Sequence, residues 1–176
     1  MRQRYPLLSL ACSVLLTSMS AAQVPKDFPG RITLPAGYVF QRPGCIDSYC
    51  GSFVKKDAPT VEIDIGEMAG VYTNDPDSTK GTVSRRTVGL PGQTAVVLIV
   101  KVSHEEQSRI RGKYAGFDAA LKKVLISFPE SKANFYSFVH TQQEIDVVEK
   151  IALSYVPESL IKTDPVGSIL SPYLKR

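Results

Sequence analysis

Residues 94–102 read TAVVLIVKV and form the most β-branched stretch of the chain. Branched apolar side chains pack well on a pleated surface, so this stretch is predicted to be a central β-strand. A second segment, residues 61–65 (VEIDI), alternates apolar with acidic residues, which indicates a strand with one buried and one polar face. Such alternation is typical of an antiparallel sheet that is covered on one side.

Further short segments, bounded by Gly, Pro and Asp, extend the strand pattern in both directions. They are residues 31–34, 38–40, 52–54, 123–128 and 133–139, of which the last two are suited to pair as a hairpin. Residues 74–81 collect turn-forming side chains and are expected to be an exposed loop, and residues 89–92 are expected to be a turn. Residues 103–114 fit either a short exposed helix or a hairpin arm.

The sequence pattern of residues 141–155 predicts the main helix of the protein. Thr141 and Glu144 have the spacing of a capping box, and the apolar side chains that follow fall on one side of the helix. Pro157 is expected to end it. Grouped strands followed by a helix predict an α+β fold: a mainly antiparallel sheet of about five to seven strands with one long C-terminal helix packed across it.

The chain of 176 residues has the length of one domain. Residues 1–22 are predicted to be a signal peptide, because Arg2 and Arg4 precede an apolar run that ends in small residues. That run is shorter than the roughly 20 residues needed to span a bilayer, so no transmembrane span is expected in the mature chain. The rest is predicted to divide into a leader (residues 23–30), a single α+β domain (residues 31–156) and a Pro-containing C-terminal tail (residues 157–176).

The charge of the chain argues against a nucleic-acid or lipid-surface partner. Removing residues 1–22 takes away two arginines and no acid, which lowers the formal net charge from +4 to +2. The remaining charges are interleaved along the chain, without a basic stripe. No phosphate-binding or calcium-binding loop motif is present, and His104 and His140 have no accompanying ligand set or nucleophile, so neither cofactor nor metal is expected.

Cys45 and Cys50 are predicted to form a disulfide. They are the two cysteines left after cleavage, and a close pair in an exported protein is most simply oxidised. The short loop would pin a local turn, and a metal pair or a catalytic thiol is the less favoured alternative. Cys12 raises a lipoprotein alternative, although the residues before it fit the lipidation pattern poorly. The expected location is periplasmic or secreted.

Five residues make up the predicted binding surface: Asp47, Tyr49, Asp64, Glu67 and Tyr72. Asp47 and Tyr49 lie inside the turn that the disulfide would pin. Asp64 and Glu67 lie at a strand end, where loops often carry functional side chains. The alternative is that these acids are solvent-facing charges and turn formers.

Two stretches carry a resemblance. The chain resembles a set of uncharacterised exported bacterial proteins of this size at residues 61–72 (VEIDIGEMAGVY) and 131–155 (SKANFYSFVHTQQEIDVVEKIALSY). These stretches are preceded by Pro-x-Gly-Tyr at residues 35–38 and Ile-Asp-Ser at residues 46–48. The likeness spans most of residues 34–155. It implies a bacterial source and an envelope or secreted setting, and it assigns no activity to any residue.

Together these patterns predict an exported, non-catalytic binding or accessory protein of the bacterial envelope, with an unknown envelope protein or a small ligand as its partner. No catalytic residue is assigned. One alternative is a small carboxylate-dependent hydrolase that uses Asp64 or Glu67 as acid or base. Another is an inhibitor or immunity-type protein that presents the pinned turn to an enzyme.

Overall fold

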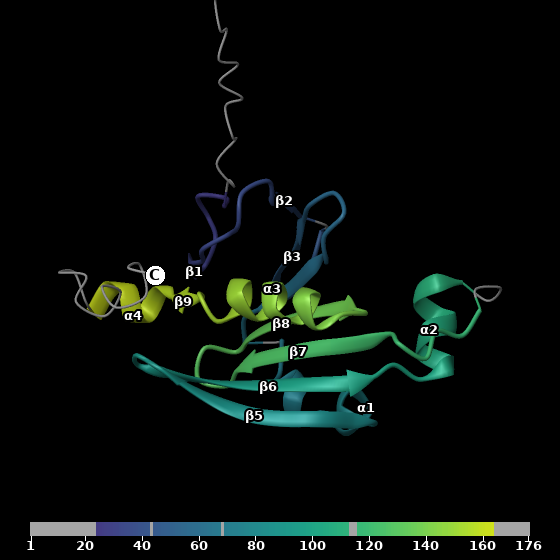
Figure 1. Ribbon diagram of the computed structural model, residues 1–176. Helices are drawn as coiled ribbons and strands as arrows, with labels where there is room; N and C mark the ends of the chain where they lie inside the picture. Colours follow the sequence, from purple (N-terminus) through teal and green to yellow (C-terminus); the bar gives the residue numbers. More distant parts are fainter. Residues whose placement is uncertain (1–23, 43, 68, 113–115, 164–176) are drawn as a thin grey trace, which may run out of the picture.

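A seven-stranded antiparallel sheet is the centre of the computed structural model, which describes residues 24–42, 44–67, 69–112 and 116–163 (Figure 1). The strand order is β2-β3-β4-β8-β7-β6-β5. The predicted α+β class and the upper end of the predicted strand number are confirmed. The predicted signal peptide and residues 164–176 of the predicted tail lie outside the described ranges. The strands are β2 (Val39–Gln41), β3 (Tyr49–Val54), β4 (Val61–Ile65), β5 (Thr82–Leu90), β6 (Gln93–Lys101), β7 (Lys122–Phe128) and β8 (Ala133–Val139).

The β-branched stretch forms β6, which lies between β5 and β7, next to the edge of the sheet. Both of its faces are covered. Ala95 and Val97 join the main core, whereas Leu98 and Val100 join a smaller apolar cluster on the opposite face. A strand that is buried on both faces reads as a continuous apolar run, which explains why this segment lacks alternation.

In β4 the alternation has the predicted effect. Val61, Ile63 and Ile65 are buried in the main core, with no more than 5% of their surface exposed. Glu62 and Asp64 are half-buried on the other face of the sheet. The strand therefore supplies the core on one side and two carboxylates on the other.

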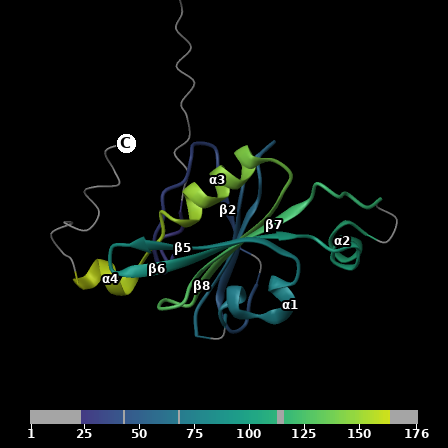
Figure 2. The same ribbon diagram turned by 60° about the horizontal axis from the view of Figure 1, so that its bottom comes forward.

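Helix α3 (Gln142–Ala152) lies across the sheet, above β7 and β8 (Figures 1 and 2). The predicted capping box is present: the Glu144 N–H donates to Thr141 Oγ1 at 3.2 Å, and Glu144 Oε2 accepts from the Thr141 N–H at 2.8 Å. The buried side of the helix, including Ile145 and Val148, closes the main core. The side of the sheet that α3 covers is called the α3 face below.

The helix ends three residues earlier than predicted. Ser154 leaves the helical path because its hydroxyl accepts a hydrogen bond from the Thr33 N–H at 2.8 Å. Tyr155 then turns into the core, and its hydroxyl donates to the Pro29 carbonyl at 3.0 Å. The predicted strand over residues 31–34 is shorter than expected. Only β1 (Gly30–Arg31) forms, pairing with β9 (Val156–Pro157) in a separate two-stranded sheet, and α4 (Glu158–Thr163) follows.

Short helical elements cover part of the opposite side, called the α1 face (Figure 2). They are the 3₁₀ helix η1 (Tyr72–Asn74) and α1 (Pro76–Thr79), so the exposed loop expected over residues 74–81 contains a helical turn. The Asp75 carboxylate caps that turn by accepting from the Asp77 and Ser78 N–H groups. The ambiguous region after β6 is a helix, α2 (His104–Arg111).

The segment expected to be a leader contributes to the core. Phe28 is only 7% exposed and makes edge-to-face contacts with Tyr49 and Tyr155, at centroid distances of 5.6 and 6.1 Å. Edge-to-face pairs add favourable energy to the burial of the rings. Residues before β1 are therefore attached to the α3 face through this ring.

Phe28→Ala is expected to lower the free energy of unfolding by about 3 kcal/mol, because it empties a buried aromatic site. Denaturant unfolding measures this change. The control is Val39→Ala in β2, where the side chain is 52% exposed and a change under about 1 kcal/mol is expected. Equal losses in the two variants would contradict the packing of Phe28 into the core.

Candidate functional site

The disulfide predicted between Cys45 and Cys50 is present, with the Cα atoms 6.1 Å apart. Cys50 lies in β3 directly opposite Asp64 of β4. Side chains of directly opposed residues share one face of a sheet. The pinned turn of residues 45–50 is therefore fixed beside the polar side of β4.

The strand register gathers polar side chains on the α1 face. Ser52 of β3 lies opposite Glu62 of β4, and Glu62 in turn lies opposite Tyr136 of β8. Asp64 lies opposite Asn134 in the same way. These side chains form a row that crosses three neighbouring strands.

Two adjoining hollows follow this row, and both are lined by Glu62 and Tyr136. The smaller, of about 290 Å³, is named the tyrosine hollow; it is lined by Cys45, Ser48, Cys50, Gly51, Glu62, Ile63, Asp64, Tyr72 and Tyr136. The larger, of about 680 Å³, lies toward the start of α3 and is lined by residues 57–60, Glu62, residues 136–138, His140 and Glu144. Three neighbouring segments within residues 45–72 thus meet Tyr136, from a distant part of the chain, around the tyrosine hollow.

Each carboxylate in the tyrosine hollow accepts a hydrogen bond from a hydroxyl. The Tyr72 hydroxyl donates to Asp64 Oδ2 at 2.5 Å, and the Ser52 hydroxyl donates to Glu62 Oε2 at 2.5 Å. The rings of Tyr72 and Tyr136 are 6.1 Å apart. Within the described part of the chain, neither Glu62 nor Asp64 forms an ion pair, and Asp64 Oδ1 is buried without a hydrogen-bond partner.

Burial and negative charge keep both phenols protonated. Burial raises the pKa of Tyr72, and the hydrogen bond to Asp64 and the charge of Asp64 raise it further. Burial also raises the pKa of Tyr136, with additional contributions from the charges of Glu62 and Asp64. At neutral pH the hollow therefore presents neutral tyrosine hydroxyls beside carboxylates.

Asn134 holds Tyr72 in place. It is buried, its Oδ1 accepts from the Tyr72 N–H at 3.1 Å and from the Ser127 hydroxyl at 2.6 Å, and its Nδ2 donates to the Gly70 carbonyl at 3.2 Å. A buried amide with these partners fixes the loop before η1 against β7 and β8. The wall of the hollow that Tyr72 forms is thus attached to the sheet.

The structure brings together only two of the five predicted surface residues, Asp64 and Tyr72. Tyr49 lies on the α3 face, where its ring stacks on Phe40 at 5.9 Å, because it is one residue away from Cys50 in a strand. Asp47 is exposed on the pinned turn and does not line either hollow.

Glu67, the other carboxylate named for the hydrolase alternative, also lies outside the hollows. Its side chain is 85% exposed and forms an ion pair with Lys132. Glu62 and Tyr136, which line both hollows, are not among the predicted surface residues, and neither is Ser52, whose hydroxyl donates to Glu62. The alternation of residues 61–65 already places Glu62 on the same face as Asp64, so this residue was within reach of sequence reasoning. Tyr136 reaches Glu62 only through the pairing of β4 with β8, which are distant in sequence, whereas Ser52 reaches it through the pairing of the consecutive strands β3 and β4.

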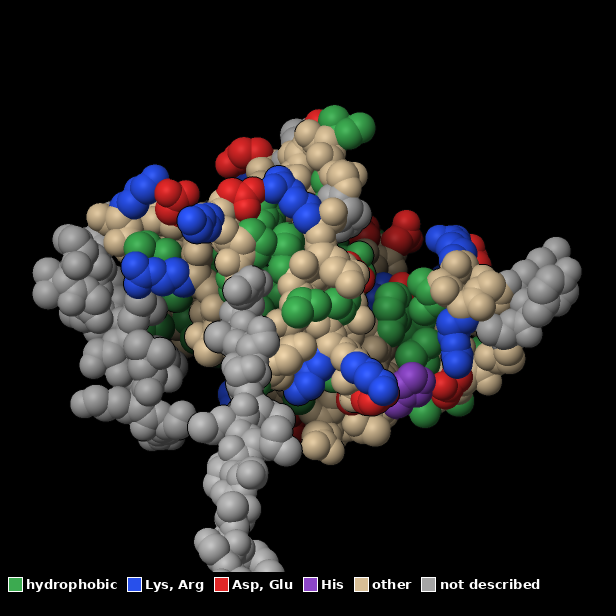
Figure 3. Space-filling view, turned by 90° about the horizontal axis from the view of Figure 1, so that it is seen from above, with side chains coloured by type: hydrophobic (Ala, Val, Ile, Leu, Met, Phe, Trp, Pro, Cys, Tyr) green, Lys and Arg blue, Asp and Glu red, His purple; other side chains and the backbone are tan. Residues whose placement is uncertain are grey.

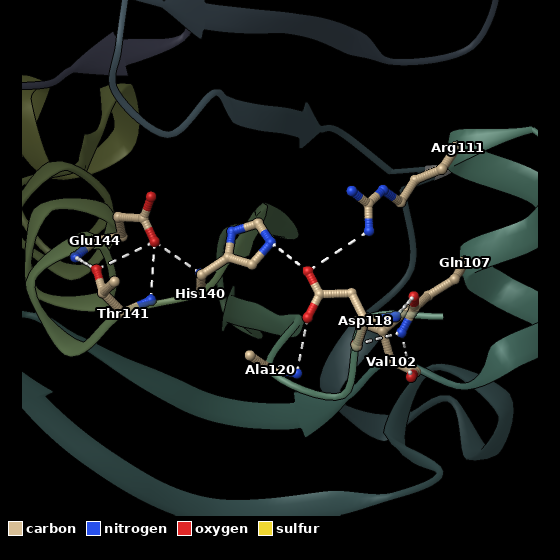
Figure 4. Close-up of polar contacts among 8 residues, drawn as sticks. All are labelled: Val102, Gln107, Arg111, Asp118, Ala120, His140, Thr141 and Glu144. Atoms are coloured by element: carbon tan, nitrogen blue, oxygen red, sulfur yellow. Dashed lines mark hydrogen bonds and ion pairs between the residues drawn. The ribbon is translucent and has the colours of Figure 1, made fainter. Parts of the chain in front are cut away.

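A second polar cluster joins α2 to the start of α3 (Figure 4). The His140 ring points at Asp118, with Nε2 2.9 Å from Oδ2, and Arg111 Nη1 lies 3.5 Å from the same oxygen. The Ala120 N–H donates to Asp118 Oδ1 at 2.9 Å and is the main cause that lowers the pKa of Asp118, followed by His140 and Arg111. The cluster fastens the chain before β7 to the end of β8.

Neither histidine is arranged for nucleophilic catalysis in the described residues. His104 packs against the ring of Phe117 at 5.8 Å, and no described hydrogen bond joins either imidazole to a serine, threonine or cysteine side chain.

The described residues contain no group of three or more metal-ligating side chains. In the view from above, basic and acidic side chains are interspersed (Figure 3). Among the described helices, none has the length and apolar character needed to cross a membrane.

Asp64→Asn is expected to lower the pKa of Tyr72, because it removes the charge that adds to the effect of burial. The value should stay above the ordinary 10.0, since burial is the larger cause. NMR titration of ring-labelled tyrosines, assigned with Tyr72→Phe, measures the shift. Glu67→Gln is the matched control and should leave the titration unchanged. An unchanged pKa of Tyr72 in the Asp64→Asn variant would contradict the hydrogen bond between Tyr72 and Asp64.

A pH dependence is expected from Glu144. Hydrogen bonds from the N–H groups of His140 and Thr141 hold its pKa below the ordinary value of 4.5. A carboxylate with a lowered pKa in the folded state stabilises the fold fully above its ordinary pKa, and loses that effect as the pH falls through the folded value. The difference in unfolding free energy between wild type and Glu144→Gln should shrink as the pH is lowered from about 6 to about 3. Urea unfolding at several pH values measures it, and a constant difference would contradict the contact.

Comparison of the chain with protein-family models, with curated proteins and with solved structures finds no match. Function is therefore inferred from the residues of the tyrosine hollow themselves. They form a concave surface of about 290 Å³ with carboxylate, hydroxyl and aromatic groups that converge from separate strands. Convergent polar groups in a concave surface are characteristic of a ligand-binding site.

Proposed function

We propose that the protein is an exported, non-catalytic binding protein of the bacterial envelope, and that it binds its partner through the tyrosine hollow and the disulfide-pinned turn beside it. The observation that carries this proposal is the meeting of the turn, Asp64, Tyr72 and Tyr136 around one hollow. The turn, β4 and η1 follow one another along the chain, and β8 (Ala133–Val139) joins them from a distant part of the sequence.

The rigidity of the hollow supports binding. The disulfide restrains one wall, and the buried Asn134 network fixes the loop that carries Tyr72. A surface that is already ordered loses little conformational entropy when a partner binds. Export is supported by the disulfide, since such bonds persist mainly in oxidising compartments, and by the signal-peptide pattern of residues 1–22.

The hydrolase alternative has weaker support. It assigns the acid or base to Asp64 or Glu67, and Glu67 is paired with Lys132 outside both hollows. Asp64 Oδ2 is already engaged, because it accepts a hydrogen bond from the Tyr72 hydroxyl. Binding requires no proton transfer and agrees with both contacts.

One observation favours a protein as the partner. Ile46, on the pinned turn, is 98% exposed. A large apolar side chain held out by a restrained turn is suited to insert into a pocket of another protein, as an inhibitor or immunity-type protein requires. In that case the turn would provide an apolar anchor and the hollow a polar contact.

The test is a thermal-shift screen of the mature protein against a small-molecule panel and against fractionated envelope extract. A partner is expected to raise the melting temperature of the wild type and of the control Glu67→Gln. The Cys45→Ser/Cys50→Ser and Tyr136→Leu variants should bind that partner at least about tenfold more weakly, which corresponds to about 1.4 kcal/mol.

Two results would contradict the proposal. One is a partner that binds these variants and the wild type equally. The other is the absence of any stabilising partner across the panel and the extract. Unfolding midpoints of the unliganded variants establish that each remains folded, and Tyr136→Leu carries the test if removal of the disulfide unfolds the domain.

A further inference from the structure

We propose that the tyrosine hollow binds an organic cation, an ammonium group, which the carboxylates of Glu62 and Asp64 hold against the ring of Tyr136. This inference rests on the proposed function and names the chemical class of the ligand. It follows from the charge of the hollow, from unused hydrogen-bonding capacity and from the arrangement of the two tyrosine rings.

The charge of the hollow is negative and uncompensated within the described residues. Glu62 and Asp64 are alternate residues of one strand, so their side chains leave the same face about 7 Å apart. The lining contains no lysine or arginine, and neither carboxylate belongs to an ion pair of the described residues. Two half-buried like charges repel one another, and a cation between them removes that repulsion.

The carboxylates also have unused hydrogen-bonding capacity. An ionised carboxylate offers about four acceptor positions, whereas the described hydrogen bonds give Glu62 only the Ser52 hydroxyl and Asp64 only the Tyr72 hydroxyl. Asp64 Oδ1 has neither exposed surface nor a partner, so the charge of Asp64 is poorly solvated. An N–H group of a cationic ligand would reach the free acceptor positions of Glu62, which lines both hollows, and the charge of the ligand would offset that of Asp64.

The two tyrosine rings suit a cation that is weakly hydrated. Their centroids are 6.1 Å apart and their planes are inclined by 51°. Both phenols stay neutral at physiological pH, because burial raises the pKa of each. The face of a neutral aromatic ring attracts ammonium and guanidinium groups. Tyr136 also lines the larger hollow, so a ligand with a chain attached to its cationic group has room to extend there.

An organic cation fits this lining better than a metal ion does. Calcium takes six to eight oxygen ligands, and the described residues hold no cluster of three or more metal-ligating side chains. Anionic ligands are disfavoured by the same two carboxylates. A neutral polyhydroxylated ligand needs donors and acceptors but no charge, so it is the competing class that the experiment must exclude.

The experiment is isothermal titration calorimetry of the mature, oxidised protein with three cationic probes: choline, putrescine and Nα-acetyl-lysine amide. Saturable binding of at least one probe is expected, and it should weaken as salt is raised, because the attraction is screened. Asp64→Asn and Glu62→Gln should each weaken binding about tenfold, since each removes one charge while keeping the shape of the side chain.

Ring variants separate the aromatic contact from the hydroxyl. Tyr136→Phe keeps the ring face and should retain binding, whereas Tyr136→Leu should weaken it about threefold or more. Glu67→Gln, which changes a carboxylate outside the hollow, is the matched control and should bind as the wild type does. If one of the two carboxylate variants fails to fold, as judged by its unfolding midpoint, the other variant decides.

The probes also separate two sources of the cation. Binding of blocked lysine without choline or putrescine assigns the group to a basic side chain of a protein partner, and the reverse assigns it to a small amine; either result supports the inference. Failure of all three probes, or affinity that does not depend on Glu62 and Asp64, would overturn it. Suppose that a neutral ligand from the small-molecule panel of the thermal-shift screen binds in a way that depends on Tyr136, and that none of the cationic probes binds. The cation is then excluded as the ligand, and the proposed function stands.

Discussion

The two-residue periodicity of β4 is the constraint on which the rest of the structure depends. Val61, Ile63 and Ile65 must face the main core, and the same pleat then places Glu62 and Asp64 on the α1 face. A shift of the register by one residue would bury both carboxylates and expose three apolar side chains. The free energy that holds the core together therefore also fixes the position of the charges in the hollow.

Neighbouring elements convert this row of side chains into a hollow with fixed walls. The disulfide holds the turn against β4, and the buried Asn134 holds Tyr72 against β8. The α3 face supplies the stability through its aromatic cluster and α3. Of its core residues only Ile63, which lies between the two acids in β4, is among the residues that line the tyrosine hollow. Stability and binding are thus assigned to opposite faces of one sheet.

Sequence reasoning recovered the features that are local. The alternation of residues 61–65, the capping box at Thr141 and the close cysteine pair each depend on neighbours within a few positions. It missed β5, because this edge strand is mostly exposed and has no apolar pattern. Tyr49 is part of the predicted binding surface, but strand alternation separates it from Cys50 and puts it on the α3 face. Tyr136 is not predicted, because only the register of distant strands brings it to Glu62.

The most direct test of the account is NMR of the ring-labelled tyrosines during titration with the probe that binds most tightly. The predicted result is that the signals of Tyr72 and Tyr136 move together along one saturating curve while Tyr49, on the opposite face, stays still. Movement of Tyr49 with both hollow tyrosines unchanged would contradict the account, because it would place the ligand on the α3 face.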